Sequence, residues 1–171
     1  MLHLSSRTIY GRIGDKMPFC RLYYHIMWCT ENRQPMLVDE ARSEIYRSIT
    51  AKVTSLGGTV YGIGGIEDHV HLACSIPPTV SLSKFVGEVK GSSSFHAGHN
   101  DNGNIPLDWQ RGYGVISFRK SDLDQVLNYI RNQQGHHSQG KVWQTLEDCG
   151  EEDSQKPNMV REEHAEYDPY A

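Results

Sequence analysis

The stretch from Ile66 to Ile76, IEDHVHLACSI, decides how this chain of 171 residues folds. Successive side chains of a β-strand point to opposite faces, so His69 and His71 share one surface while Val70 and Leu72 share the other. The apolar surface can enter a core. The two imidazoles stand about 7 Å apart along the strand, close enough to bind one metal ion. The pattern predicts a strand with one core face, and a second face that either binds a metal or is merely covered by histidines.

Length and composition indicate a single domain with tails. With 171 residues, of which 37% are hydrophobic, the chain can bury one core but hardly two. The sequence has no run of 18 apolar residues and no basic N-terminal segment followed by an apolar run, so we expect neither a membrane span nor a secretory signal. The four cysteines form no C-x-x-C pair, which is typical of reduced thiols. We therefore expect a cytoplasmic protein.

Charge is unevenly distributed along the chain. Residues 145–171 hold nine acidic and two basic residues, a net charge of about −7, whereas the preceding part carries about +3. Residues 1–17 have no sustained periodicity and are expected to form a disordered leader. The folded domain is predicted at 18–144 and an acidic C-terminal tail at 145–171. The mildly basic body permits phosphate binding without demonstrating it.

Hydrophobic periodicity predicts the order strand, helix, strand, strand, helix, strand, helix. The first six elements match the split βαβ, ferredoxin-like pattern, an α+β fold with one antiparallel sheet and two helices on one face. In this fold the first and third strands are the inner pair, so the histidines rise from the middle of the sheet on its open face. The last helix is free to lie across that face. The strands are expected at 20–30, 59–66, 69–76 and 112–118, and the helices at 39–56, at 81–95 and from 121 onward.

Two polar residues of the last helix can reach the open face. Tyr129 and Gln133 are one helical turn apart, beside the apolar stripe rather than opposite to it. His136 continues this row if the helix passes Gly135. Taken alone, Tyr129 would be a packing residue and Gln133 a solvated one.

Five segments, taken in order, carry a family resemblance. They are YYHIMWCTENRQPML (23–37), EDHVHLACSIPP (67–78), FVGEVKGSSS (85–94), WQRGYGVISF (109–118) and YIRNQQGHH (129–137). Together they resemble the single-tyrosine HUH transposases of bacterial insertion sequences, most of all the branch that includes the REP-associated tyrosine transposases. The likeness covers approximately residues 19–137 and is much more specific than a histidine pair alone.

The resemblance implies a role for four residues. His69 and His71 would bind a divalent cation with Gln133 as the third ligand, and Tyr129 would be the catalytic nucleophile. The family acts on single-stranded DNA, often beside a hairpin, and forms a covalent 5′-phosphotyrosine while releasing a 3′-hydroxyl. The implied cation is magnesium or manganese, although the nitrogen ligands would also suit zinc, cobalt or nickel. Both homodimers and monomers occur in the family, and no membrane partner is implied.

The chemistry of these residue types agrees with the implied reaction. A tyrosine hydroxyl has an unperturbed pKa of about 10, so it needs assistance to attack at neutral pH. A metal ion can provide this by neutralising and positioning the phosphate. Exchange of one phosphodiester for another needs no nucleotide fuel, and the sequence has no G-x-x-x-x-G-K-[ST] loop.

Basic residues that flank these positions are the candidates for holding the DNA backbone. Trp109 and Tyr113 are available for base stacking. Each candidate taken alone is more typical of a solvated surface. The basic candidates are Lys84, Lys90, Arg111, Arg119, Lys120 and Arg131.

Three other functions compete with this interpretation. A histidine-triad nucleotide hydrolase needs a third alternating histidine, but position 73 is Ala73. A relaxase or replication-initiation nuclease uses related HUH chemistry, but the short chain and the absence of a helicase region disfavour it. The main alternative is a domesticated single-stranded or hairpin DNA-binding protein without transposition. The presence of all four implied residues disfavours a loss of the chemistry, but it leaves a loss of mobility open. Asp68 and Glu67 either orient a histidine, join the metal shell or simply form the turn.

Overall fold

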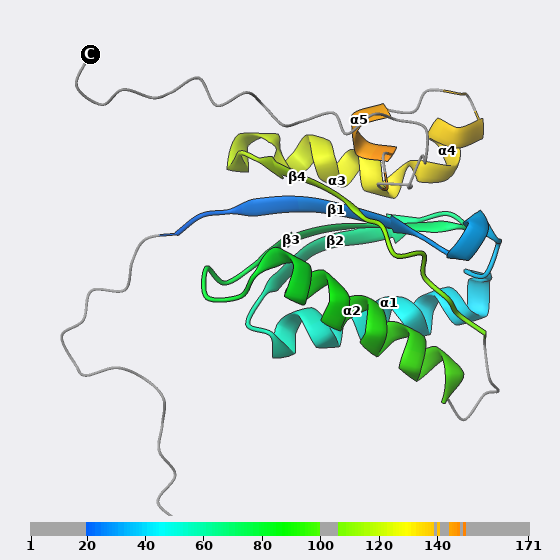
Figure 1. Cartoon of the computed structure of the whole chain (residues 1–171). Helices are drawn as coiled ribbons and strands as arrows, with labels where there is room; N and C mark the ends of the chain where they lie inside the picture. The colour runs from blue at the N-terminus through cyan, green and yellow to red at the C-terminus, as the bar shows by residue number, and fades with distance from the viewer. Residues whose placement is uncertain (1–19, 100–105, 139, 141–143, 148, 150–171) are drawn as a thin grey trace, which may run out of the picture.

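The computed structural model describes residues 20–99, 106–138, 140, 144–147 and 149. In this part of the chain, a four-stranded antiparallel sheet in the order β2-β3-β1-β4 lies between two layers of helices (Figure 1). The predicted α+β architecture is confirmed. The strands are β1 (Tyr23–Cys29), β2 (Thr59–Gly65), β3 (His69–Ser75) and β4 (Gly114–Phe118). The helices are α1 (Asp39–Ser55), α2 (Leu82–Gly98), α3 (Leu123–Arg131), α4 (Gln133–Ser138) and α5 (Gln144–Glu147), with short 3-10 turns at Glu31–Arg33 and Lys120–Asp122.

The first and third strands are the inner pair of the sheet, as predicted. The antiparallel register of β1 and β3 places Met27 opposite His71 and Cys29 opposite His69. The second strand pairs with β3 as a hairpin, and β4 pairs with the other side of β1. The His-x-His strand therefore has a neighbour on each side, which fixes the direction of its side chains.

One face of the sheet packs against α1 and α2 and forms the main core. Ile26 and Trp28 of β1 and Val70 and Leu72 of β3 are buried on this face. They alternate with side chains that point to the opposite face, as a period of two requires. The helices contribute apolar residues at helical spacing. These are Ala41, Ile45, Ile49 and Val53 from α1, and Phe85, Val86 and Val89 from α2.

The opposite face is covered by α3, α4 and α5, which Figure 1 shows on the far side of the sheet from α1 and α2. Val126 and Ile130 of α3 pack on Ala73 of β3. The last helix, expected to be continuous, is instead interrupted at Asn132, whose φ of −101° and ψ of 20° are not helical. A new helix, α4, begins at Gln133.

The predicted domain limits fall partly outside the described residues, because 1–17 and most of 145–171 are not described. The described part of the proposed tail is packed on the domain: Leu146, Glu147 and Cys149 are all buried. Packing therefore continues past residue 144. Among the described helices, none has the length and apolar character needed to span a membrane.

Candidate active site

The two histidines of β3 are fully buried under α3 and α4, on the face away from the main core. The Nδ1 atom of each ring forms a hydrogen bond with a neighbouring side chain. Asp68 Oδ1 accepts from His69 Nδ1 at 2.6 Å, and His25 Nε2 shares a hydrogen bond of 2.9 Å with His71 Nδ1. Because Nδ1 is engaged in both rings, their Nε2 atoms are left for a ligand.

Tyr129 and Gln133 meet these histidines from the other side. Gln133 Oε1 lies 3.4 Å from His69 Nε2. The Tyr129 ring stands edge-on to the His71 ring, with 5.8 Å between centroids. Tyr129 is 3% and Gln133 2% exposed. The structure thus brings together the four residues for which the sequence predicted a shared site.

Two glycines of β2 allow the helix that carries Tyr129 to lie this close to the sheet. A Cβ at Gly62 would stand 2.5 Å from Leu127 Cδ2, and a Cβ at Gly64 would stand 2.6 Å from the carbonyl oxygen of Ile130. The second contact is with backbone, which cannot move aside without moving the helix. The absence of side chains at these positions therefore helps to set the distance between Tyr129 and the histidines.

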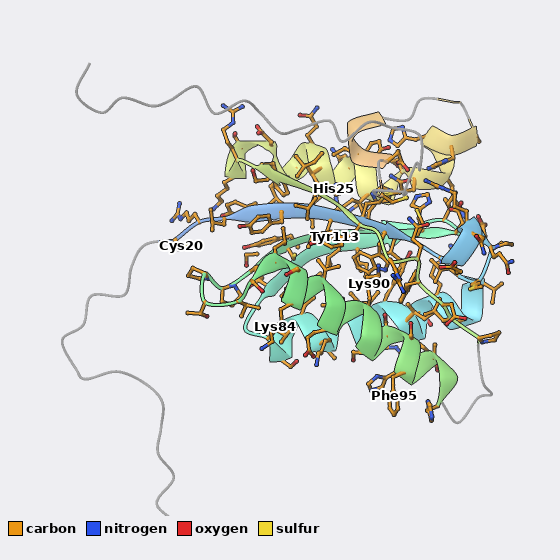
Figure 2. The ribbon with its side chains drawn as sticks, in the orientation of Figure 1. Cys20, His25, Lys84, Lys90, Phe95 and Tyr113 are labelled. Carbon is orange, nitrogen blue, oxygen red and sulfur yellow. The ribbon has the colours of Figure 1, made fainter. Side chains whose placement is uncertain are left out.

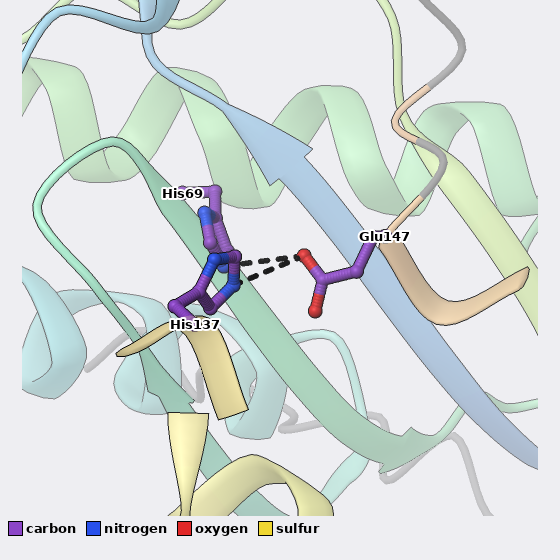
Figure 3. Close-up of side chains that lie close together, drawn as sticks. All are labelled: His69, His137 and Glu147. Atoms are coloured by element: carbon purple, nitrogen blue, oxygen red, sulfur yellow. Dashed lines mark ion pairs between the residues drawn. The ribbon is translucent and has the colours of Figure 1, made fainter. Parts of the chain in front are cut away.

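Two further residues complete the cluster, and the sequence interpretation did not include them. Figure 3 shows His137 of α4 and Glu147 of α5 beside His69. Glu147 Oε2 lies 3.5 Å from His137 Nε2 and 3.6 Å from His69 Nε2, and Glu147 Oε1 lies 3.4 Å from His71 Nε2. His137 follows Gln133 by one helical turn, a spacing that could have signalled it. Glu147 has no such signal, because its position depends on how the chain returns to the sheet.

Glu147 also contacts the proposed nucleophile. The Tyr129 hydroxyl donates a short hydrogen bond to Glu147 Oε1. Burial would raise the pKa of Glu147, but the neighbouring His71, then the hydrogen bond from Tyr129 and the nearby His69, lower that pKa to about 2. Glu147 is consequently an ionised carboxylate at neutral pH.

His25 and His71 are neutral at the same pH. Burial, reinforced by the nearby His71, lowers the pKa of His25 to about 3. Burial is also the main cause that lowers the pKa of His71, opposed by the nearby Glu147 carboxylate, which raises it. The pKa of Asp68 is lowered too: burial alone would raise it, but the hydrogen bond and charge of His69 together with the Arg33 guanidinium outweigh burial. A neutral imidazole is the form that binds metal ions.

The residues present fit a divalent cation. Within the described residues, His71 Nε2 and His137 Nε2 are buried and have no hydrogen-bond partner. Donor atoms of His69, His137 and Glu147 all lie within 4.8 Å of one another. Imidazole nitrogens, a carboxylate and the Gln133 amide oxygen form a donor set that suits a first-row divalent metal.

The predicted DNA-binding residues do not form one surface. Lys90 is buried in α2, and its Nζ donates to the backbone carbonyls of Gln110, Arg111 and Gly112. Lys84 is exposed on the same helix, and Figure 2 shows both lysines on the opposite side of the sheet from α3. Lys90 therefore joins α2 to the segment before β4.

The other basic candidates are exposed. Arg119 and Lys120 precede α3, and Arg131 ends it, so these three belong to the layer that carries Tyr129. Arg119 is paired with Asp122 at 3.2 Å. Arg111 is exposed before β4.

The two aromatic candidates are engaged in packing. The Trp109 indole donates to Ser93 Oγ at 2.9 Å and stands edge-on to Trp28. Tyr113 is partly buried against the main core.

A DNA transposase is the class of protein that the family match defines for this sheet and its buried histidine pair. Residues 19–133, about two thirds of the chain, match the family described as "Transposase IS200 like", so the chain belongs to this family. The predicted family is confirmed.

Two relatives and two solved structures illustrate the similarity. The chain is 28% identical over 124 residues to the ISDra2 transposase TnpA of Deinococcus radiodurans, covering 66% of this chain and 84% of that protein. It is 28% identical over 117 residues to the transposase for insertion sequence element IS200 of Salmonella typhimurium, covering 64% and 75%. The first structure, a crystal structure of a Deinococcus radiodurans R1 protein, has a TM-score of 0.52 and 23% identity over 71% of this chain and 98% of that one. The second, a REP-associated tyrosine transposase bound to a REP hairpin, has a TM-score of 0.53 and 14% identity over 76% of each chain. These two structures support the fold.

Proposed function

We propose that this protein cleaves and rejoins single-stranded DNA through a covalent 5′-phosphotyrosine at Tyr129. The observation that carries the proposal is the meeting of Tyr129 with the His69 and His71 pair in one buried cluster. Membership of the transposase family supplies the substrate class, DNA.

In the proposed reaction, the Tyr129 oxygen attacks the phosphorus of a phosphodiester and the bond from phosphorus to the 3′-oxygen breaks. The phenol loses its proton, the departing 3′-oxygen gains one, and the 5′-phosphate stays on the tyrosine. Attack by the 3′-hydroxyl of another strand reverses these changes and joins the two strands. A magnesium or manganese ion held by His69, His71 and Gln133 would neutralise charge on the nonbridging phosphate oxygens.

The surrounding residues hold the reacting groups in place. Asp68 and His25 fix the rings of His69 and His71 through the Nδ1 atoms, so that both Nε2 atoms are presented to the site. Of the roles left open by the sequence, orienting a histidine is the one that the contacts of Asp68 support. Glu147 accepts the hydrogen bond of the Tyr129 hydroxyl and so orients the nucleophile.

Hairpin-bearing single strands are the proposed partner, because a similar fold binds a REP hairpin in a solved structure. Arg119, Lys120 and Arg131 would contact the DNA backbone, since they belong to the same layer as Tyr129. We further propose that the protein works in the cytoplasm, where chromosomal DNA is accessible. A homodimer is a second proposal, to be tested by light scattering of the purified protein.

One observation favours the alternative of a DNA-binding protein without transposition. Tyr129 is almost completely buried, and its hydroxyl is engaged by Glu147. A phosphodiester reaches this oxygen only if the segment that carries Glu147 moves. If that segment does not move, the protein binds hairpins and leaves them intact.

The decisive test is to incubate the protein with labelled hairpin-bearing single strands and manganese, and to separate the products on a denaturing gel. The wild type should form a protein–DNA adduct, and Tyr129→Phe should form none while keeping the wild-type circular dichroism spectrum. Tyr113→Phe is the matched control and should form the adduct. An adduct with Tyr129→Phe would show that the nucleophile is a different residue, and hairpin binding without any wild-type cleavage would support the alternative.

A further inference from the structure

We propose that Glu147 and His137 are additional ligands of the metal ion. The inference rests on the proposed function, because it concerns the cation of the same site. Both residues lie beyond the segment 19–133 that matches the family. This chain would therefore supply a carboxylate and a third imidazole to the cation from its own C-terminal part.

The distances around Glu147 are the first support. They are 3.6 Å to His69 Nε2, 3.4 Å to His71 Nε2 and 3.5 Å to His137 Nε2. A direct hydrogen bond between nitrogen and oxygen is shorter, at about 2.7–3.2 Å. Two ligands bound to one five- or six-coordinate ion through bonds of about 2.1 Å, at angles of about 90–120°, stand about 3.0–3.6 Å apart. The separations therefore fit atoms that share an ion better than atoms that bond to each other.

The second support is that, among the described residues, two of the three nitrogens near Glu147 have no hydrogen-bond partner. In the described part of the chain, His71 Nε2 and His137 Nε2 are buried without a hydrogen-bond partner. Buried polar atoms rarely lack a partner, and each such atom needs an explanation. The Nδ1 atom of His71 is already engaged by His25, so its Nε2 atom is the one left to bind an ion. A shared cation would satisfy both nitrogens at once.

Packing of the C-terminal segment is the third support, because it holds Glu147 at this place. Leu146 and Cys149, on either side of Glu147, are buried. Cys149 packs with Met27 and Cys29 of β1. Its sulfur also accepts a hydrogen bond of 3.0 Å from Gln110 Nε2. The carboxylate is therefore anchored on both sides and is not the end of a loose tail.

The two ligands would change the character of the site. Without Glu147, the protein ligands of the cation are neutral; with it, they carry one negative charge, and affinity for divalent cations rises with the number of charged ligands. Three imidazoles favour manganese, cobalt or zinc over magnesium, which prefers oxygen ligands. Manganese alone is therefore the suitable probe.

The test measures manganese binding to the full chain without DNA, by titration calorimetry and by the loss of the free manganese signal in electron paramagnetic resonance. Glu147→Gln, which keeps the size of the side chain, and His137→Gln should each weaken binding by about tenfold or more. Asp124→Asn removes an exposed carboxylate of α3 and is the matched control, expected to bind as the wild type does. His69→Ala should bind no manganese.

Each result separates this inference from the proposed function. If Glu147→Gln and His137→Gln bind manganese within about twofold of the wild type while His69→Ala does not bind, the inference is wrong and the proposed metal site stands. If the wild type binds no manganese, the metal-dependent part of the proposed function fails as well. Thermal unfolding in the presence of EDTA checks that the variants are folded. If Glu147→Gln does not fold, Glu147→Asp replaces it, and wild-type affinity in that shortened variant would overturn the role of Glu147.

Discussion

The two faces of the sheet are made by the same strands but bury different side chains. On one face, Leu72 and Ile26 join an apolar core beneath α1 and α2. On the other face, His71 and His25, one position away in the same strands, are buried beneath α3 and its neighbours. The central strands therefore divide their residues between packing and chemistry with a period of two.

The two faces of the sheet need different side chains to be stable when they are buried. An apolar face needs side chains of suitable size and period, and each buried side chain contributes about 1.5–3 kcal/mol through the hydrophobic effect. A buried polar face must give its polar atoms partners, because each unsatisfied atom costs about 1–3 kcal/mol. We infer that stability comes mainly from the helix-packed core, and that the histidine face is kept for its chemistry.

The largest expected effect is on stability, from a change on the core face. Leu72 is fully buried, so Leu72→Ala should lower the free energy of unfolding by about 2–5 kcal/mol. Urea unfolding followed by circular dichroism measures the change. Adduct formation per folded molecule should stay near the wild-type level, because Leu72 points away from Tyr129. A loss below about 1 kcal/mol would contradict the assignment of this face as the main source of stability.

A pair of glycines tests how closely the site layer packs on the sheet. A Cβ at Gly64 would stand 2.6 Å from the Ile130 carbonyl oxygen, so Gly64→Ala should cost about 1–3 kcal/mol and should reduce adduct formation by displacing Tyr129. For Gly87 in α2, the described residues leave the space around a Cβ open to 4 Å, and Gly87→Ala should stabilise the protein by about 0.5–1 kcal/mol. Urea unfolding and the adduct assay compare the two variants. Equal effects would show that the contact between Gly64 and Ile130 is not tight.

Lowering the pH should reduce the free energy of unfolding mainly through the buried histidines, because the described apolar core has no group that titrates there. His25 has a pKa of about 3 in the folded protein, against about 6.5 when unfolded, so its stabilising contribution is present above pH 6.5 and is lost as the pH falls toward 3. His71, whose pKa is also lowered, changes stability in the same direction. His25 alone should account for a loss of about 1 kcal/mol between pH 6.5 and pH 5.5.

Two variants test whether His25 causes this pH dependence of stability. His25→Phe should reduce the loss measured by urea unfolding at the two pH values, whereas His96→Gln, which changes an exposed residue of α2, should leave it unchanged. The residues that interact electrostatically with His25 are His71, which lowers its pKa, and Glu147, which raises it. An unchanged loss in His25→Phe would mean that His25 does not carry this dependence.

The smallest expected effect concerns DNA affinity. Arg131 lies in the site layer and Lys84 on the far side of the sheet, so only Arg131→Gln should weaken binding of a hairpin strand. The expected loss is about threefold to tenfold, with the slope of log affinity against log salt reduced by about 1. Fluorescence anisotropy at several salt concentrations measures both quantities. A similar loss in Lys84→Gln would place DNA on both faces and remove the distinction between them.

The sequence predicted the parts of the molecule that depend on local periodicity. The alternation around His69 predicted both faces of β3, and the order of the elements predicted that this strand is an inner one. Tyr129 and Gln133 could be placed together because they are one helical turn apart. The family resemblance then connected them with the histidines.

The parts that sequence reasoning missed depend on contacts between distant segments. The partner of His71 is His25, whose position beneath that ring follows from the register of β1 and β3 and not from any motif. Three carbonyls before β4 accept hydrogen bonds from the ammonium group of Lys90, one of the DNA-binding candidates, and no local pattern indicated these contacts. Glu147 was assigned to an acidic tail, because charge alone does not show that the chain returns to the sheet.

The central claim is that the Tyr129 oxygen, beside the buried histidines, is the nucleophile that attacks the DNA phosphodiester. Mass spectrometry of the adduct between the wild-type protein and a hairpin-bearing strand, after proteolysis and nuclease digestion, tests this claim most directly. We expect a nucleotide fragment attached through its 5′-phosphate to the peptide that contains Tyr129. Attachment to any other tyrosine, or cleavage without a covalent adduct, would contradict the account.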